Sequence, residues 1–426
     1  MLKRKTILFM VALVMLFTLQ NSTVVAKPEL ELPLELEGVL RGAAYRIVVP
    51  ENWNGTLLVF ARGYSAQTTA VEVAFLVEEQ LLERGYALAG SALRSAGIRL
   101  DQYTLDLKYL TDLFKQKVAK PEHIVIYGIS MGGDLTLRSM EKFPGTYDAG
   151  IPLCAGGAGL IRYTSSKFSF ALAYDAAFGW DPSWGFVEDV RDDLEFYGDV
   201  WFAKAYDEFF TPTYPANFAR WEFVRLVNNL PLEDYYMYDG PLPMPPAGIS
   251  NMYFSTFERA QLEGAAGGRV SQNIGYVYSL SADDRAYLQA LDPALDLDAM
   301  LAQMNAMTGI KADPWALAFM ERIGEFSGRV QGPILMAHTV KDGVNPVEHT
   351  TEYAKLMASV GTEDLLTRVY SGLPGHCNFT EEQMLALFEA MDAWLATGDA
   401  PTPDAFPEAL GFVHDFEPGS WPQPPQ

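Results

Sequence analysis

The sequence predicts an α/β fold, in which a mostly parallel sheet carries helices on both faces and a mainly helical segment is inserted in the middle of the chain. Between residues 56 and 153, short apolar runs typical of buried strands alternate with helical patterns. The alternation then stops for about 170 residues and resumes near residue 333. Of the 54 aromatic residues, 31 lie between Leu160 and Ser327. The interruption therefore indicates an insertion with a core of its own.

The elements follow from local patterns along the chain. Residues 38–50 are expected to form β-structure, because Tyr45, Ile47 and Val49 alternate with polar or small neighbours. The further strands expected are 56–60, 86–89, 124–127, 150–153, 333–338 and 367–370, and the helices expected are 71–84, 105–118, 131–143, 347–359 and 381–396. Thr380 and Gln383 stand at the N-cap and N3 positions of the last helix, the two members of a capping box.

These elements divide the 426 residues into five parts. We expect a signal peptide at 1–26, the first part of the α/β core at 27–159, a cap or lid insertion at 160–327, the second part of the core at 328–400 and a tail at 401–426. Seven of the last 26 residues are prolines, so the tail is expected to be irregular.

The N-terminal segment has the layout of a secretory signal peptide. Lys3, Arg4 and Lys5 precede a 13-residue apolar run, and small residues lead up to Ala26. Thirteen apolar residues are fewer than the roughly 20 that span a bilayer, although an uncleaved anchor is the alternative. We therefore expect a secreted or periplasmic protein with no stable membrane insertion after cleavage.

The charge balance limits the partners. The chain has 31 basic and 54 acidic residues, a net charge of −23, which repels nucleic acid and anionic lipid surfaces. No metal-ligand spacing and no phosphate-binding glycine loop is found, so no metal and no cofactor is expected. The expected partner is a small-molecule substrate.

A nucleophile motif occupies residues 128–132, Gly-Ile-Ser-Met-Gly. It follows a predicted strand and opens a predicted helix, which is the context that gives G-x-S-x-G its meaning. Gly128 and Gly132 are required because the turn is too tight for flanking side chains. Ser130 is thereby lifted clear of the sheet as a candidate nucleophile.

The base and the acid are expected in two later loops. Of the five histidines, His376 lies between the last strand and the last helix, where the chain order Ser…Asp…His requires the base. Asp342 follows the preceding strand and would orient His376, which would take the Ser130 proton and return it to the leaving group. Glu348 is an alternative acid, less favoured because it falls in a predicted helix.

The three motifs give the chain a family resemblance. Residues 128–133 (Gly-Ile-Ser-Met-Gly-Gly), 338–346 (His-Thr-Val-Lys-Asp-Gly-Val-Asn-Pro) and 375–380 (Gly-His-Cys-Asn-Phe-Thr) resemble the signatures of the α/β-hydrolases. The resemblance covers about 38–159 and 328–396, with a cap where that superfamily commonly inserts one. Within it, the chain is most similar to secreted bacterial serine hydrolases of the esterase kind.

The resemblance also implies an oxyanion hole. One backbone N–H would come from Met131 and the other from Tyr64, with Gly63 as the alternative. Many relatives have His-Gly where this chain has Arg62-Gly63, a change that leaves a backbone donor intact.

The two cysteines are expected near this site. Cys154 ends the strand after the nucleophile helix, and Cys377 adjoins His376. We predict a disulfide between them in an exported protein, with two free buried thiols as the alternative.

The function expected is hydrolysis of carboxylic esters with an apolar or aromatic part, through an acyl-enzyme on Ser130. The aromatic insertion motivates the substrate class, since several of its aromatic side chains are expected to line an apolar pocket while most form its own core. The alternatives with the same triad are a peptidase or amidase and an acyltransferase. An inactive binding protein would lack a triad member, and none is missing. The aromatic and methionine residues typical of the insertion are Trp180, Trp184, Trp201, Trp221, residues 235–238 and Met244.

Overall fold

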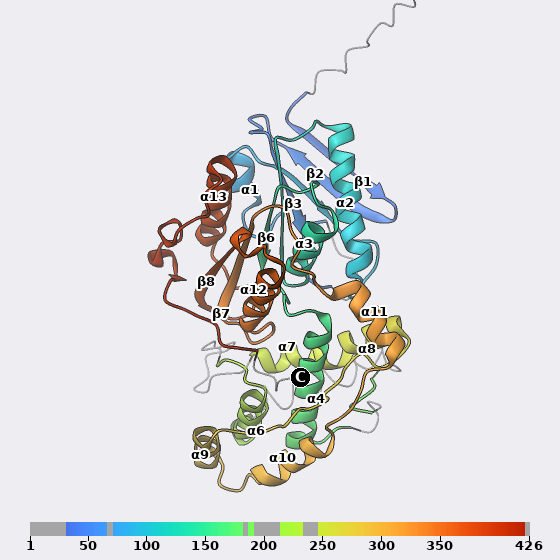
Figure 1. Ribbon diagram of the computed structural model, residues 1–426, viewed down its shortest axis with the longest axis vertical. Helices are drawn as coiled ribbons and strands as arrows, with labels where there is room; N and C mark the ends of the chain where they lie inside the picture. Colours follow the sequence, from blue (N-terminus) through green and yellow to red (C-terminus); the bar gives the residue numbers. More distant parts are fainter. Residues whose placement is uncertain (1–30, 66–70, 182–185, 191–213, 233–245, 422–426) are drawn as a thin grey trace, which may run out of the picture. The chain divides into compact units, whose positions relative to one another are not determined.

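The computed structural model describes residues 31–65, 71–181, 186–190, 214–232 and 246–421. Residues Leu32–Gln426 form one compact unit, shown in Figure 1. The predicted signal peptide lies outside the described residues, as do Trp184, Trp201, residues 235–238 and Met244 of the insertion.

A nine-stranded sheet forms the centre of this unit, in the order β1-β2-β4-β3-β5-β6-β7-β8-β9. The pairs from β4 through β3, β5, β6 and β7 to β8 are parallel, and only β1–β2, β2–β4 and β8–β9 are antiparallel. The strands are β1 (Leu34–Leu40), β2 (Ala43–Val49), β3 (Thr56–Ala61), β4 (Ala87–Ser91), β5 (His123–Ile129), β6 (Ala149–Leu153), β7 (Ile334–Lys341), β8 (Leu366–Pro374) and β9 (Phe412–Val413). The predicted α/β class with a mostly parallel sheet is confirmed.

Helices cover both faces of the sheet (Figure 1). On one face, α1 (Glu78–Glu83) and α13 (Glu381–Thr397) share an apolar cluster with the strands. On the other, α2 (Leu100–Lys117) packs against α3 (Met131–Lys142), which packs on β5 and β6. The remaining core helix is α12 (Glu348–Val360). The predicted capping box of α13 is confirmed, with Thr380 accepting from the Gln383 N–H.

One local prediction was wrong, and two were right only in part. Residues 71–77 are not helical, because this segment is pressed against β4: a side chain at Gly90 would meet the Glu72 carbonyl at 1.9 Å. The N-terminal β-structure is a hairpin that begins at Leu34 and turns through Arg41 and Gly42, both with positive φ. The tail is not wholly irregular, since β9 pairs with β8.

The insertion is mainly helical in the part that the structure describes. Its helices gather at one end of the sheet (Figure 1) and bury a separate apolar cluster that includes Trp221 and packs against Trp180. Its elements are α4 (Leu160–Phe178), α6 (Tyr214–Val227), α7 (Pro246–Tyr253), the π-helix η3 (Phe254–Glu258), α8 (Arg259–Ala266), α9 (Ala282–Leu291), α10 (Leu297–Ala306) and α11 (Pro314–Gly324).

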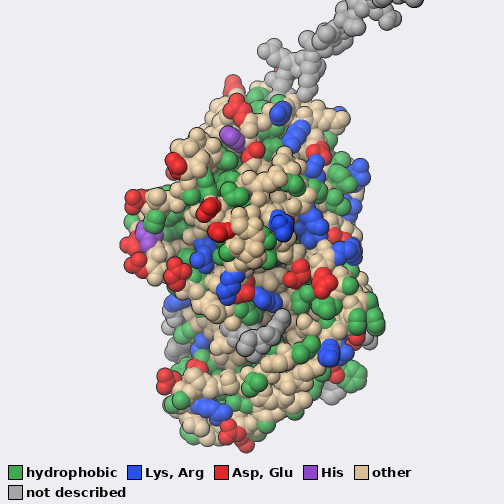
Figure 2. Space-filling model, in the orientation of Figure 1, with side chains coloured by type: hydrophobic (Ala, Val, Ile, Leu, Met, Phe, Trp, Pro, Cys, Tyr) green, Lys and Arg blue, Asp and Glu red, His purple; other side chains and the backbone are tan. Residues whose placement is uncertain are grey.

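The surface is mixed in charge. On the face in Figure 2, Asp and Glu side chains are interspersed with Lys and Arg. Among the described residues, no helix is both long enough and apolar enough to span a membrane.

Candidate active site

Ser130 stands on a sharp turn between β5 and α3. Its backbone has φ 55° and ψ −122°, a left-handed conformation that a residue with a side chain adopts only under constraint. The glycines on either side make the turn feasible. A Cβ at Gly128 would lie 2.4 Å from the Ala61 carbonyl oxygen, and one at Gly132 would lie 1.9 Å from the same atom. The turn therefore presents the serine hydroxyl above the carboxyl edge of the sheet.

The structure brings the three predicted site residues together. His376 Nε2 lies 2.8 Å from Ser130 Oγ, and His376 Nδ1 lies 2.7 Å from Asp342 Oδ2. These distances are within normal hydrogen-bond range and link the three side chains in one chain. Glu348, the alternative acid, lies in the first turn of α12.

Asp342 is held as a carboxylate by its surroundings. The side chain is fully buried, and Oδ1 accepts from the backbone N–H groups of Val344 and Asn345, both at 2.9 Å. Burial by itself raises the pKa of this carboxyl, but His376 and the Asn345 N–H outweigh it and bring the pKa below its usual value. A charged Asp342 orients the imidazole and fixes its proton on Nδ1.

The insertion takes part in holding this acid loop. From α4, Lys167 donates to the Val344 carbonyl at 2.6 Å and to Asn251 Oδ1. Asn251, on α7, donates to the Gly343 carbonyl at 2.6 Å. The same short loop thus points its amides at Asp342 and its carbonyls at two buried side chains of the insertion.

A pocket opens beside Ser130. It contains about 470 Å³ of empty space, part of it open to solvent, and includes Tyr64 and Met131, the predicted oxyanion-hole residues. The insertion contributes three aromatic side chains to it, Tyr163, Phe254 and Phe326. Trp180 and Trp221, in contrast, pack in the core of the insertion.

Two acidic side chains in the pocket were missed from the sequence. Asp134 lies one helical turn after Ser130 on α3, and Glu258 ends the π-helix η3. Burial raises the pKa of each carboxyl to about 8. The i, i+4 spacing from Ser130 is a signal for Asp134, whereas nothing local in the sequence places Glu258.

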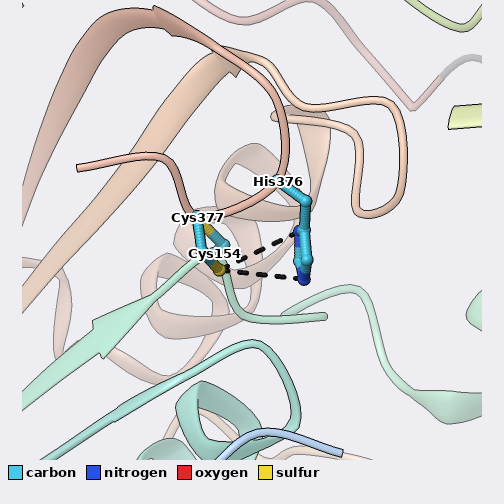
Figure 3. Close-up of side chains that lie close together, drawn as sticks. All are labelled: Cys154, His376 and Cys377. Carbon is cyan, nitrogen blue, oxygen red and sulfur yellow. Dashed lines mark hydrogen bonds between the residues drawn. The ribbon is translucent and has the colours of Figure 1, made fainter. Parts of the chain in front are cut away.

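The predicted Cys154–Cys377 disulfide is wrong, because both residues are free buried thiols. The prediction of proximity holds: Figure 3 shows the two side chains next to each other beside the His376 ring. Cys377 Sγ lies 3.7 Å from His376 Nε2 and 4.0 Å from the Leu153 carbonyl oxygen. Burial and the neighbouring Cys154 raise the pKa of the Cys377 thiol well above its usual value, so the thiolate needed for disulfide exchange is disfavoured.

Among the described residues, two groups of three side chains hold their possible metal-ligand atoms within 4.8 Å of one another. The groups are Cys154–His376–Cys377 and Cys154–His338–Asp342. They do not fit a metal well, since both nitrogens of His376 and both oxygens of Asp342 already have hydrogen-bond partners. We therefore assign these side chains no metal.

The sheet order, the strand–serine–helix turn and the three loops at one edge define an α/β-hydrolase fold. No family model matches the chain. It is 25% identical over 420 residues to an o-phthalyl amidase from Xanthobacter agilis, covering 87% of this chain and 89% of the relative.

Solved structures similar to the chain include two esterases. One from Aspergillus oryzae is 14% identical with a TM-score of 0.42, covering 86% of this chain and 80% of its own. One from Pyrococcus furiosus is 12% identical with a TM-score of 0.41, covering 85% of this chain and 90% of its own.

Proposed function

We propose that the protein is an exported serine hydrolase that cleaves carboxylic esters with an apolar or aromatic part. The observation that carries this proposal is the hydrogen-bonded chain from Ser130 through His376 to the buried Asp342, beside a pocket with three aromatic walls from the insertion.

Export rests on the predicted signal peptide, and N-terminal sequencing of protein from the periplasm or medium tests it: a mature chain beginning after Ala26 supports export.

The geometry suits a two-step acyl transfer. Ser130 Oγ attacks the ester carbonyl carbon while its proton moves to His376 Nε2, and the resulting oxyanion accepts from the backbone N–H groups of Met131 and Tyr64. The C–O bond to the alcohol then breaks, and the alcohol leaves with the proton from His376. Water next attacks the acyl carbon and gives its proton to His376. The acid leaves as that proton returns to Ser130 Oγ.

Covalent labelling tests the nucleophile. A fluorophosphonate probe should form one adduct, on Ser130 of the folded protein, and Ser130→Ala should form none. Absence of an adduct on Ser130 would contradict the proposed function, whatever the natural substrate is.

A second candidate is amide hydrolysis, which the o-phthalyl amidase relative favours. The same triad serves both reactions, since His376 can protonate a leaving amine as well as an alcohol. A panel of nitrophenyl esters, nitroanilides with the same acyl groups and feruloyl esters separates the two. Faster turnover of the esters supports the esterase, whereas nitroanilides hydrolysed at comparable rates would assign an amidase.

Lys167 is expected to act as a positioning residue for the acid loop. Lys167→Met keeps most of the side-chain volume but leaves the Val344 carbonyl without this donor, so the amides that orient Asp342 lose support. We expect kcat to fall about tenfold, equivalent to about 1.4 kcal/mol, with KM little changed. Lys355→Met, at an exposed lysine of α12, is the matched control. An unchanged kcat for Lys167→Met, or a change confined to KM, would remove this role.

A further inference from the structure

Two carboxyl groups line the pocket beside Ser130. Asp134 comes from the nucleophile helix α3, and Glu258 comes from η3 of the insertion, where its side chain is only 3% exposed. Neither takes part in the triad. Asp134 is half-buried, although its Oδ1 atom is shielded from solvent. A carboxyl oxygen removed from water costs free energy unless it is hydrogen-bonded or paired.

Asp134 lacks a donor for one oxygen. Its Oδ1 is buried and has no hydrogen-bond partner among the described residues. A buried acceptor without a partner costs about 1–3 kcal/mol, which a donor on a bound molecule would recover. Glu258 accepts from the Tyr163 hydroxyl at 2.6 Å, so this carboxyl is fixed in direction by α4.

No residue that lines the described pocket carries a positive charge. Lys167 lies behind two of the pocket walls, with Nζ 4.9 Å from the Tyr163 ring centroid and 5.8 Å from that of Phe254. Its charge lowers the pKa of Glu258, but its hydrogen bonds go to Asn251 and Val344. The other walls are Ser130, Asn345 and apolar or tyrosine side chains. Burial raises the pKa of the Tyr64 and Tyr163 hydroxyls, which therefore stay neutral. The residues that line the pocket thus offer acceptors and apolar walls, and the neighbouring cation, Lys167, is already hydrogen-bonded elsewhere.

We propose that Asp134 and Glu258 bind an ammonium group of the substrate, placing an amine-bearing apolar or aromatic group in the pocket next to Ser130. This inference rests on the proposed function and names its substrate class. The ammonium would supply N–H donors to Asp134 Oδ1 and a positive charge between the two carboxyls, while Leu160, Phe254 and Phe326 would contact the apolar part. Where Asp134 and Glu258 are ionised, they would repel an anionic group in the same place.

The ionisation of Asp134 and Glu258 determines whether ammonium binding strengthens or weakens as the pH rises. With pKa values of about 8, Asp134 and Glu258 are largely protonated near neutral pH, and an arriving cation favours their ionised forms. Binding an ammonium therefore releases protons and strengthens as pH rises toward 8. Burial also lowers the pKa of Lys167 to about 8. Lys167 therefore loses its positive charge over the same pH range, and this loss also strengthens the binding of an ammonium.

Protection of Ser130 from a fluorophosphonate probe tests the proposal without a substrate. Three competitors of similar shape are compared: benzylamine, benzyl alcohol and benzoate. We expect benzylamine to halve the labelling rate at about one-tenth of the concentration needed for benzyl alcohol, and benzoate to be the weakest. In the wild-type protein, protection by benzylamine should strengthen between about pH 6 and pH 8, whereas protection by benzyl alcohol should not.

Substitutions test which side chains cause the preference for benzylamine. Asp134→Asn and Glu258→Gln should each reduce the advantage of benzylamine over benzyl alcohol, and Asp298→Asn, at an exposed aspartate of α10, should retain it. Equal protection by amine and alcohol, or stronger protection by benzoate, would overturn the inference while leaving the proposed function intact. Loss of labelling without any competitor would instead contradict the proposed function.

Discussion

Asp342→Asn is expected to lower kcat by about 10⁴-fold while leaving the fold intact. Asp342 Oδ1 accepts from the backbone N–H groups of Val344 and Asn345, so the amide oxygen of an asparagine must occupy that position. Its NH₂ group then faces His376 Nδ1, which at present lies 2.7 Å from Asp342 Oδ2. The orientation of the new side chain is therefore determined by the loop.

This orientation selects the wrong tautomer of the base. An NH₂ donor facing Nδ1 makes that nitrogen an acceptor and puts the proton on Nε2, 2.8 Å from Ser130 Oγ. His376 can then no longer accept the serine proton. The substitution changes no volume, so a loss of rate reports the proton position rather than packing.

The measurement is kcat on a nitrophenyl ester, with far-ultraviolet circular dichroism to verify the fold. Asp298→Asn makes the same chemical change at an exposed site of α10 and should retain the wild-type kcat. A loss smaller than about tenfold would show that Asp342 does not set the His376 tautomer. Glu348→Gln would then be the next variant to test, since Glu348 is the other acid considered.

Much of the core was predictable because its signals are local. The buried strands β3, β5 and β6 are continuous apolar runs, and the glycines around Ser130 mark a turn that only glycine permits. Residues 71–77 misled the prediction because Val73 and Val77 are buried as a helix pattern requires, but they pack in the sheet cluster from irregular backbone. Tertiary packing there overrides local propensity.

The candidate triad was predictable for a topological reason, whereas the pocket was not. In a parallel sheet, loops after successive strands meet at one edge, so the order of strands places Ser130, Asp342 and His376 together. Glu258 reaches the same pocket through a π-helix in the insertion, a feature without a reliable sequence signal. The oxidation state of Cys154 and Cys377 could not be predicted either, because their positions after two strands predict that they lie close together but not that they form a disulfide.

Gly132→Ala is expected to reduce both stability and labelling of Ser130. A Cβ at this position would lie 1.9 Å from the Ala61 carbonyl oxygen and 2.7 Å from the Arg62 carbonyl oxygen, both backbone atoms. Ala61 ends β3 and pairs with Gly128 on β5, so relief of the clash requires the first turn of α3 to move away from the sheet. We expect a loss of about 3 kcal/mol or more in the free energy of unfolding.

The same displacement would move Ser130 and the Met131 N–H relative to His376, so labelling by the fluorophosphonate should slow even where the variant is folded. Urea denaturation and the labelling rate measure the two effects separately. Gly264→Ala is the matched control, because Gly264 lies in α8 with no atom within 4 Å of its added Cβ, and alanine there should stabilise the helix by up to about 1 kcal/mol. A Gly132→Ala protein as stable and as reactive as the wild type would show that the turn tolerates a side chain, and the glycine would lose its structural role at the nucleophile.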